Sequence, residues 1–294
     1  MRYTKRTLFV GLFLFATLTC NAQLLWRISG KDLPGDSFLF GTKHDEAIGF
    51  CDNRPGFDEA FRSVGQAYFE IAFKDIPETA DPRASQFMPN GKSLTSLYDK
   101  EQMSVVLDYI ARVTGVRYGQ VNFTPRGLSV FLQSFLARKA FPDKNPETDM
   151  LMEETLQSRA EAMGIPVHGL ETYAFQMDFL YGKSLEEQAM ELLESLKSPA
   201  SDPDSLVANM RALAKAYENE DLAVLEQLFL PQRPTSFATE LLDDRNATWI
   251  PIMTAAMNER PTFFAVGAGH LLGENGLISL LRKQGYTLTP VPVQ

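Results

Sequence analysis

The residues of this chain with the clearest chemical potential are two histidines that share the same four-residue frame, Gly-x-x-His. The frames run from Gly41 to His44 and from Gly267 to His270, near opposite ends of the 294-residue chain. With 19 glycines and three histidines in the chain, chance would supply roughly 0.2 such frames, against the two that are present. Each frame follows a short apolar run that is typical of a buried strand. Two imidazoles at two strand ends predict one shared site, and a divalent metal ion is its expected occupant.

Two glutamates are candidates to complete that site. Glu70 lies inside an otherwise apolar run, and Glu171 follows the short apolar segment 167–170. In open α/β sheets, ligands bind beyond the carboxyl ends of the strands, where these side chains and the two histidines would meet. Imidazole and carboxylate together suit Zn²⁺, Mn²⁺ or Co²⁺, and such an ion can lower the pKa of a water molecule toward neutrality. The alternatives are that Glu70 points to solvent and that Glu171 only caps the helix that begins near residue 172.

A charged cluster at Arg245 and Asn246 interrupts an apolar helix. Three roles are open for Arg245: it can pair with one of the two glutamates, bind a substrate carboxylate through two hydrogen bonds, or face solvent.

The glycines of the two frames have a backbone role. Gly41, Gly267 and Gly269 permit a sharp exit from each strand and a close approach of neighbouring chain segments, which would hold each histidine on rigid backbone.

The chain is rich in strands at both ends and helical in the middle. Strands are expected at residues 24–28, 37–40, 66–73, 166–170, 262–266 and 286–291. Helices are expected at residues 56–64, 100–114, 125–140, 148–163, 184–196, 201–218, 221–229, 236–258 and 273–284. Ser184 and Glu187 form a capping box, and Pro251 should bend or interrupt the helix at 236–258. The predicted fold class is α/β with an α+β tendency: a central mixed sheet from the N- and C-terminal segments beneath a large helical layer or lid.

The first 22 residues are read as a secretory signal, because a basic start precedes an apolar stretch at residues 8–18. Cleavage after Ala22 is favoured over a lipid anchor on Cys20, so the protein is expected to be periplasmic or secreted. Residues 23–294 should form one domain with a helical insertion at about 93–260, and no transmembrane helix is expected in the mature chain. Cys51 would then stand alone, without an internal disulfide.

The formal net charge of −9, with no basic stripe along the chain, argues against nucleic acid as a partner. The sequence makes no prediction of the oligomeric state.

At these residues the chain resembles the TraB/PrgY/GumN family, which includes the Tiki metalloproteases. The resemblance covers nearly all of the mature chain and is most specific at the C-terminal end, at 264–273, 276–278, Leu281 and 285–286. Residues 37–44 resemble the family's opening strand and first Gly-x-x-His, and further matches lie at Phe69–Glu70, 169–172, Gln176, Arg245–Asn246 and Trp249. It implies a metal-dependent, peptidase-like activity with Mn or Co as the ion and a peptide or protein as the substrate.

The resemblance also implies roles for individual residues. His44 and His270 would bind the metal, Glu70 would be a third ligand or a general base, and Glu171 and Arg245 would act in catalysis. Asn246 would line the site and is predicted to contact the substrate. Lys43 and Asp45 depart from the apolar residues that are more usual beside the first histidine of the family, so they could change the mouth of the site, and Lys43 is predicted to contact the substrate as well. The leading hypothesis is therefore an exported metal-dependent hydrolase. The alternatives are a non-catalytic protein that binds a peptide or haem, and a structural protein in which the two frames only stabilise strand ends.

Overall fold

The structure is a computed structural model that describes residues 23–44, 48–81, 83–89, 92–117, 121–144, 152–230 and 239–292. The predicted signal segment, residues 1–22, lies outside these ranges, as do parts of the helices predicted at 148–163 and 236–258. Within the described ranges, no helix combines the length and the apolar character that a membrane crossing requires.

Six strands form one mixed sheet in the order β4-β3-β5-β2-β1-β6. The strands are β1 (Leu25–Ser29), β2 (Ser37–Thr42), β3 (Gln66–Phe69), β4 (Val167–Gly169), β5 (Thr262–Gly267) and β6 (Thr287–Pro290). Strands β4, β3, β5 and β2 run parallel, and β1 is antiparallel to both β2 and β6. Because β2 and β5 are neighbours, with Thr42 opposite Gly267, the two ends of the chain meet in one sheet as predicted.

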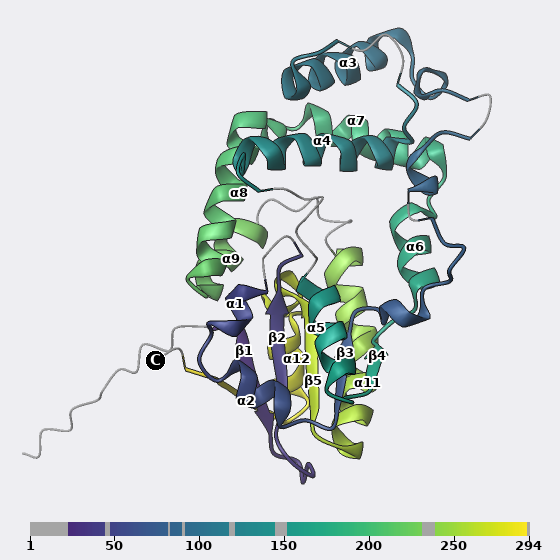
Figure 1. The fold of residues 1–294 in the computed structure, drawn as a ribbon. Helices are drawn as coiled ribbons and strands as arrows, with labels where there is room; N and C mark the ends of the chain where they lie inside the picture. The colour runs from purple at the N-terminus through teal and green to yellow at the C-terminus, as the bar shows by residue number, and fades with distance from the viewer. Residues whose placement is uncertain are drawn as a thin grey trace, which may run out of the picture.

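The central strands are buried because helices cover both faces of the sheet. Strand β5 is buried from Thr262 to Val266, the continuous apolar run expected of a parallel strand with two covered faces. On one face Phe263 packs edge-on against Phe57 and Phe61 of α2 (Phe57–Arg62). Helices α1 (Gly49–Asp52) and α5 (Met152–Ala162) lie on that face, while α11 (Arg245–Glu259) and α12 (Leu277–Lys283) cover the other (Figure 1).

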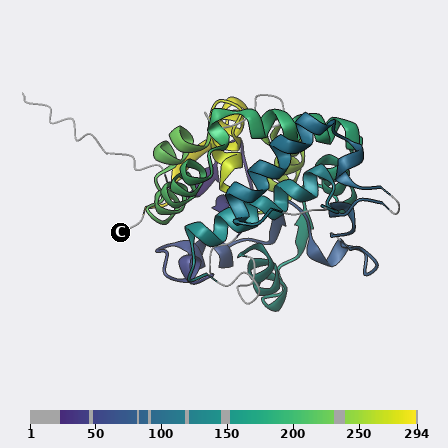
Figure 2. The ribbon, with the colours of Figure 1, turned by 90° about the horizontal axis from the view of Figure 1, so that it is seen from above.

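The middle of the chain builds a separate helical layer. Helices α3 (Lys100–Thr114), α4 (Pro125–Ala140), α7 (Leu185–Lys197) and α8 (Pro203–Glu218) pack on one another around their own apolar core. Helices α6 (Tyr173–Tyr181) and α9 (Leu222–Phe229) lie between that layer and the sheet (Figure 1), and the view from above shows α3, α4 and α7 crossing over the sheet (Figure 2). Short 3-10 turns complete the described elements: η1 (Phe73–Asp75), η2 (Ala84–Gln86), η3 (Leu94–Ser96), η4 (Pro199–Ser201) and η7 (Ala268–Leu271).

Local signals in the sequence were mostly reliable guides to these elements. The capping box of Ser184 and Glu187 begins α7, as predicted. The predicted interruption at Pro251 is wrong, because α11 continues through it; burial of Ile250 and Met253 in the core outweighs the one backbone hydrogen bond that proline removes. The irregularity lies earlier, where a π-helix, η6 (Thr239–Asp244), runs directly into α11. The strand predicted at 66–73 ends at Phe69, so Glu70 lies just past a strand end rather than within it.

Candidate functional site

The parallel part of the sheet brings the two histidines and the two glutamates of the predicted site to one edge. His44 follows β2, Glu70 follows β3, Glu171 follows β4, and His270 lies on η7 directly after β5. Two backbone hydrogen bonds extend the β3–β4 pairing beyond the strands, and one of them joins the Glu171 amide to the Glu70 carbonyl at 2.9 Å. The two carboxylates are therefore held side by side, as the carboxyl ends of neighbouring parallel strands should be.

Arg245, the first residue of α11, joins the two glutamates. Its Nη2 donates to Glu70 Oε2 and to Glu171 Oε1, each at 2.7 Å, and its Nε donates to Glu171 Oε2 at 3.0 Å. Its Nη1 donates to the Leu241 carbonyl at 3.1 Å and approaches His270 Nε2 at 3.2 Å. All five N–H hydrogens of the guanidinium thus have acceptors within the protein. Of the roles open to Arg245, pairing with the glutamates is confirmed, and it pairs with both.

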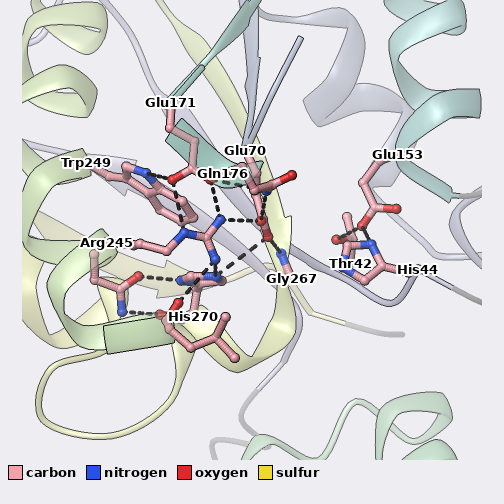
Figure 3. A network of polar contacts seen from close by, with 12 residues as sticks. Thr42, His44, Glu70, Glu153, Glu171, Gln176, Arg245, Trp249, Gly267 and His270 are labelled. Atoms are coloured by element: carbon pink, nitrogen blue, oxygen red, sulfur yellow. Dashed lines mark hydrogen bonds and ion pairs between the residues drawn. The ribbon is translucent and has the colours of Figure 1, made fainter. Parts of the chain in front are cut away.

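The side chains of both glutamates are largely enclosed by this network, with 13% of Glu70 and 5% of Glu171 exposed. Glu171 also accepts hydrogen bonds from Trp249 Nε1 at 3.1 Å and from Gln176 Nε2 at 3.1 Å (Figure 3). The alternative that Glu171 caps the following helix is wrong, because the cap of α6 is Thr172. The alternative that Glu70 points to solvent is also wrong, because its side chain is only 13% exposed.

Glu70 is held in its ionised form. Burial raises the pKa of this carboxyl, whereas the charges of protonated His270, of Arg245 and of protonated His44 lower it, together with a hydrogen bond from the Gly267 amide. The net effect is a pKa of about 2. The Gly267 N–H donates to Glu70 Oε1 at 2.9 Å, so the carboxylate is fixed to the end of β5 as well as to Arg245.

Hydrogen bonds fix which nitrogen of the buried His270 ring carries the proton. Asn246 Nδ2 donates to the carbonyls of His270 and Asn275, at 3.2 and 2.8 Å, so the amide oxygen must face the ring. That oxygen lies 2.7 Å from His270 Nδ1, which therefore donates to it. Arg245 can only donate, so Nε2 is the acceptor of its 3.2 Å contact. In its neutral form His270 therefore carries its lone pair on Nε2, which also lies 3.7 Å from Glu70 Oε1, and Trp249 lies against the ring with a centroid distance of 4.4 Å.

His44 is also held by a hydrogen bond at Nδ1, but its partner is a carboxylate, whereas the partner of His270 is a neutral amide. His44 Nδ1 lies 2.8 Å from Glu153 Oε1, and the Thr42 hydroxyl donates to the same oxygen (Figure 3). Burial raises the pKa of Glu153, but its hydrogen bond to His44, the charge of that ring when protonated and the Thr42 hydroxyl lower it more. An ionised carboxylate can only accept, so Nδ1 of His44 donates, and in the neutral ring the lone pair falls on Nε2. The His44 side chain is 66% exposed, in contrast to the buried His270.

His44 and His270 line one cavity of about 450 Å³ beneath the helical layer. Its polar end is formed by Thr42, Lys43, His44, Glu70, Arg245, Gly267 and His270. Its opposite wall is apolar and comes mainly from α4, α8, α9 and η6: Ala137, Phe141, Met210, Leu213, Ala214, Tyr217, Leu225, Phe229, Leu241 and Leu242. A cavity of this volume, with few polar groups at one end, has the character of a small-ligand or substrate site. Lys43 lies about 6 Å from the rings of Phe141 and Tyr217.

The polar end is divided into two groups. In Figure 3 the pair of His44 and Glu153 stands apart from the cluster of Arg245, Glu70, Glu171 and His270. Across the part of the chain that the structure describes, no three His, Cys, Asp or Glu side chains are grouped closely enough to hold one ion. The structure therefore places the predicted ligands on one cavity without forming a metal centre from them.

The glycines of the two frames permit close packing rather than unusual backbone angles. A Cβ on Gly41 would lie 3.1 Å from Ala268 Cα, and one on Gly269 would lie 2.8 Å from the Phe229 ring. A Cβ on Gly267 would lie 3.2 Å from Glu70 Oε1. Side chains at these positions would separate β2 from η7 and push on the site carboxylate, which agrees with the expected role in close approach.

Glu153 and the apolar wall are not among the features predicted from the sequence. The signal for Glu153 is its position on the buried face of α5, in helical register with the buried residues Leu156, Gln157 and Ala160. A carboxylate on that stripe needs an internal partner. The sequence predicts that Asn246 contacts the substrate; in the structure it is buried and its amide is bonded to His270 and Asn275.

Comparison with known proteins identifies the family. The chain belongs to the TraB/PrgY/gumN family, whose profile matches residues 24–290. It is 25% identical over 315 residues to Metalloprotease TIKI1 of Danio rerio, covering 92% of this chain and 63% of that protein. It is 24% identical over 320 residues to Metalloprotease TIKI2 of Danio rerio, covering 92% of this chain and 61% of the relative. Human Metalloprotease TIKI1 is 23% identical over 321 residues, covering 92% and 62%.

The chain thus spans about three fifths of the length of these curated relatives. No solved structure matches it significantly. The predicted family is confirmed, and the names of the relatives attribute metal-dependent proteolysis to those proteins.

Proposed function

We propose that the cavity is the active site of a metal-dependent peptide hydrolase. The observation that carries the proposal is that the two histidines form the same kind of hydrogen bond through Nδ1. Each ring donates its Nδ1–H to a side-chain oxygen, so the neutral form of each has its lone pair on Nε2, and both rings line one cavity. Metal-binding histidines are oriented in this way, with one ring nitrogen on the ion and the other bonded to an oxygen.

The donor set fits a divalent ion. His44 and His270 would supply nitrogen and Glu70 would supply an ionised carboxylate, a combination that suits Mn²⁺, Co²⁺ or Zn²⁺. When bound, such an ion polarises a peptide carbonyl and makes a water molecule more acidic. Loading the site requires the Arg245 N–H to leave His270 Nε2, because both would use the same lone pair.

The chain's own residues supply the remaining functions. Arg245 holds Glu70 and Glu171 in fixed positions, and Glu70 is the candidate to accept a proton from water. The apolar wall of the cavity offers contact area for a substrate side chain and reduces the access of bulk water to the polar end. Lys43, at the same end of the cavity, is the candidate to contact a substrate carbonyl or carboxylate.

The proposal is tested by metal analysis of the purified protein beside three matched variants. His44→Ala and His270→Ala should each lower the bound Mn²⁺, Co²⁺ or Zn²⁺. His168→Ala should not, because that third histidine stacks on Tyr68 rather than lining the cavity. Peptidase turnover should disappear in EDTA and return when one of these ions is added. If His44→Ala and His270→Ala both bound as much metal as the unaltered protein, the proposal would be rejected.

A non-catalytic peptide-binding protein is the second candidate. The extended apolar wall favours it, since such a surface binds peptide side chains with or without an ion. A binder of this kind would retain a labelled peptide in EDTA and release no cleavage product, whereas the hydrolase would release product only with the ion present.

We also propose that the protein is exported and that cleavage after Ala22 removes its leader. The basic and apolar pattern of residues 1–22 supports this. N-terminal sequencing of protein recovered outside the cytoplasm should begin at Gln23; a start at Met1 would contradict the proposal.

A further inference from the structure

We propose that Glu153 is the positioning residue of the metal site: it holds the Nδ1–H of His44 and so presents the Nε2 lone pair of that ring. This inference rests on the proposed function, because it assigns a role toward the same ion.

The first support is the burial of Glu153 and the exposure of the ring that it contacts. Glu153 is buried on α5, whereas the His44 side chain is 66% exposed and lies just past the end of β2. The Thr42 hydroxyl, from the last residue of β2, donates to the same Glu153 oxygen that accepts from His44. Helix, strand and ring are therefore tied together at one atom, Glu153 Oε1. Because the hydrogen bond to this oxygen uses Nδ1, it orients the exposed ring relative to the helix and the strand.

The second support is that Glu153 gains little from its position as a structural residue. Its other oxygen, Oε2, is buried and has no hydrogen-bond partner within the described residues. A buried carboxylate with one unbonded oxygen costs stability, and an apolar side chain would fill the same place at lower cost. A carboxylate behind a ligand imidazole, however, strengthens the attraction of that imidazole for a cation. The arrangement suits orientation of a metal ligand better than packing of the core.

Comparison of the two histidines suggests a substitution that separates the effect of the charge from that of the hydrogen bond. An amide oxygen, that of Asn246, supports His270, and a carboxylate oxygen supports His44. Glu153→Gln would give His44 the kind of neutral support that His270 already has, with the hydrogen bond retained and the charge removed. Glu153→Ala would remove both. Glu154→Gln is the matched control, because the adjacent residue is exposed and carries the same charge.

The first experiment uses metal-free protein and reads the ring directly. The chain has three histidines, so ¹⁵N-labelled imidazoles give a simple NMR spectrum in which the protonated nitrogen of each ring is identified. At a pH where His44 is neutral, the unaltered protein, Glu153→Gln and Glu154→Gln should all show Nδ1–H. Glu153→Ala should lose this preference. A His44 ring that stays in the Nδ1–H form in Glu153→Ala overturns the proposal.

The second experiment measures the dissociation constant of Co²⁺ by titration, followed by its visible absorption. Loss of a supporting residue typically weakens metal binding about 10- to 100-fold, which is expected for Glu153→Ala. Glu153→Gln should weaken it less, and Glu154→Gln should leave it unchanged. Wild-type Co²⁺ affinity in both Glu153 variants overturns the inference while leaving the proposed function intact, provided that His44→Ala loses Co²⁺. Wild-type affinity in His44→Ala overturns both.

Thermal melting of each variant separates positioning from structural damage. If Glu153→Ala fails to fold, the near-isosteric Glu153→Gln still decides the question. It should keep the Nδ1–H form of His44 and bind Co²⁺ more weakly than the unaltered protein. Unchanged Co²⁺ binding in this variant would then refute the role of the carboxylate charge.

Discussion

Arg245→Met is the substitution whose effect on the free energy of unfolding follows most directly from the contacts in the site. It leaves Glu70 and Glu171 side by side without the cation that now contacts both. The side chains of Arg245, Glu70 and Glu171 are 6%, 13% and 5% exposed, so water screens the lost interaction only weakly. Removing one partner of a buried ion pair costs about 3–5 kcal/mol. For a chain of this size that loss lowers the melting temperature by roughly 6–20 °C.

The loss of stability in Arg245→Met should also depend on pH. Arg245 is one of the groups that lower the pKa of Glu70 to about 2, so Glu70 contributes stability that is fully present above its ordinary pKa of 4.5. That contribution is lost as the pH falls from 4.5 toward 2. Without Arg245 the pKa of Glu70 rises, and the variant loses less on acidification. The difference in stability between the two proteins should be largest at neutral pH and should shrink below about pH 4.5.

The assay is urea unfolding of metal-free protein at several pH values, followed by circular dichroism. Arg260→Met is the control, since its ion pair with Glu259 is about half exposed and should contribute little. A loss below about 1 kcal/mol for Arg245→Met at neutral pH would refute the assignment of Arg245 as a buried counter-ion. So would a larger loss that stays constant as the pH falls.

Three further predictions test separate parts of the structure. Trp249→Phe removes the indole N–H that donates to Glu171 at 3.1 Å, and it should cost about 1–3 kcal/mol in urea unfolding; no measurable loss would contradict that hydrogen bond. Gly41→Ala should cost about 1–3 kcal/mol, because its Cβ would press on the start of η7, whereas Gly49→Ala should cost nothing, because its Cβ meets no atom within 4 Å; equal effects would refute the packing argument. Burial raises the pKa of the Cys51 thiol to about 12, so in a background without the N-terminal cysteine a thiol reagent should label Cys51 only on unfolding; rapid labelling of native protein would be the contrary result.

The location of the site was predictable from sequence because it depends on strand ends. Apolar runs mark β2 and β5 as buried strands, and buried parallel strands must share an edge where the residues that follow them meet. His44, His270 and Glu70 are placed by this rule alone. The rule needs no knowledge of loop conformation, because each of the three lies within three residues of a strand end.

The interactions among those residues were not predictable, because they are set by segments distant in sequence. Whether Arg245 pairs with carboxylates or faces solvent depends on how α11 packs beside the sheet, and the sequence left both outcomes open. The apolar wall likewise comes from helices whose faces are defined only once they pack over the cavity. Glu153 is an intermediate case. Its place on the apolar stripe of α5 signals an internal partner, but only the fold shows that the partner is His44.

The charges around the polar end of the cavity favour a cation over an anion as its ligand. Glu70, Glu171 and Glu153 place three carboxylates at or directly behind that end, and Arg245 is already fully hydrogen-bonded to two of them. The positive charge of Lys43 at the same end does not bring the sum to zero. With both histidines neutral, the surplus is negative in a region partly shielded from water, where electrostatic interactions are strong. A divalent ion would offset that surplus, whereas an anion would add to it. The same reasoning predicts that sulfate or phosphate will not compete with Co²⁺ for the cavity, which a titration in the presence of either anion would check.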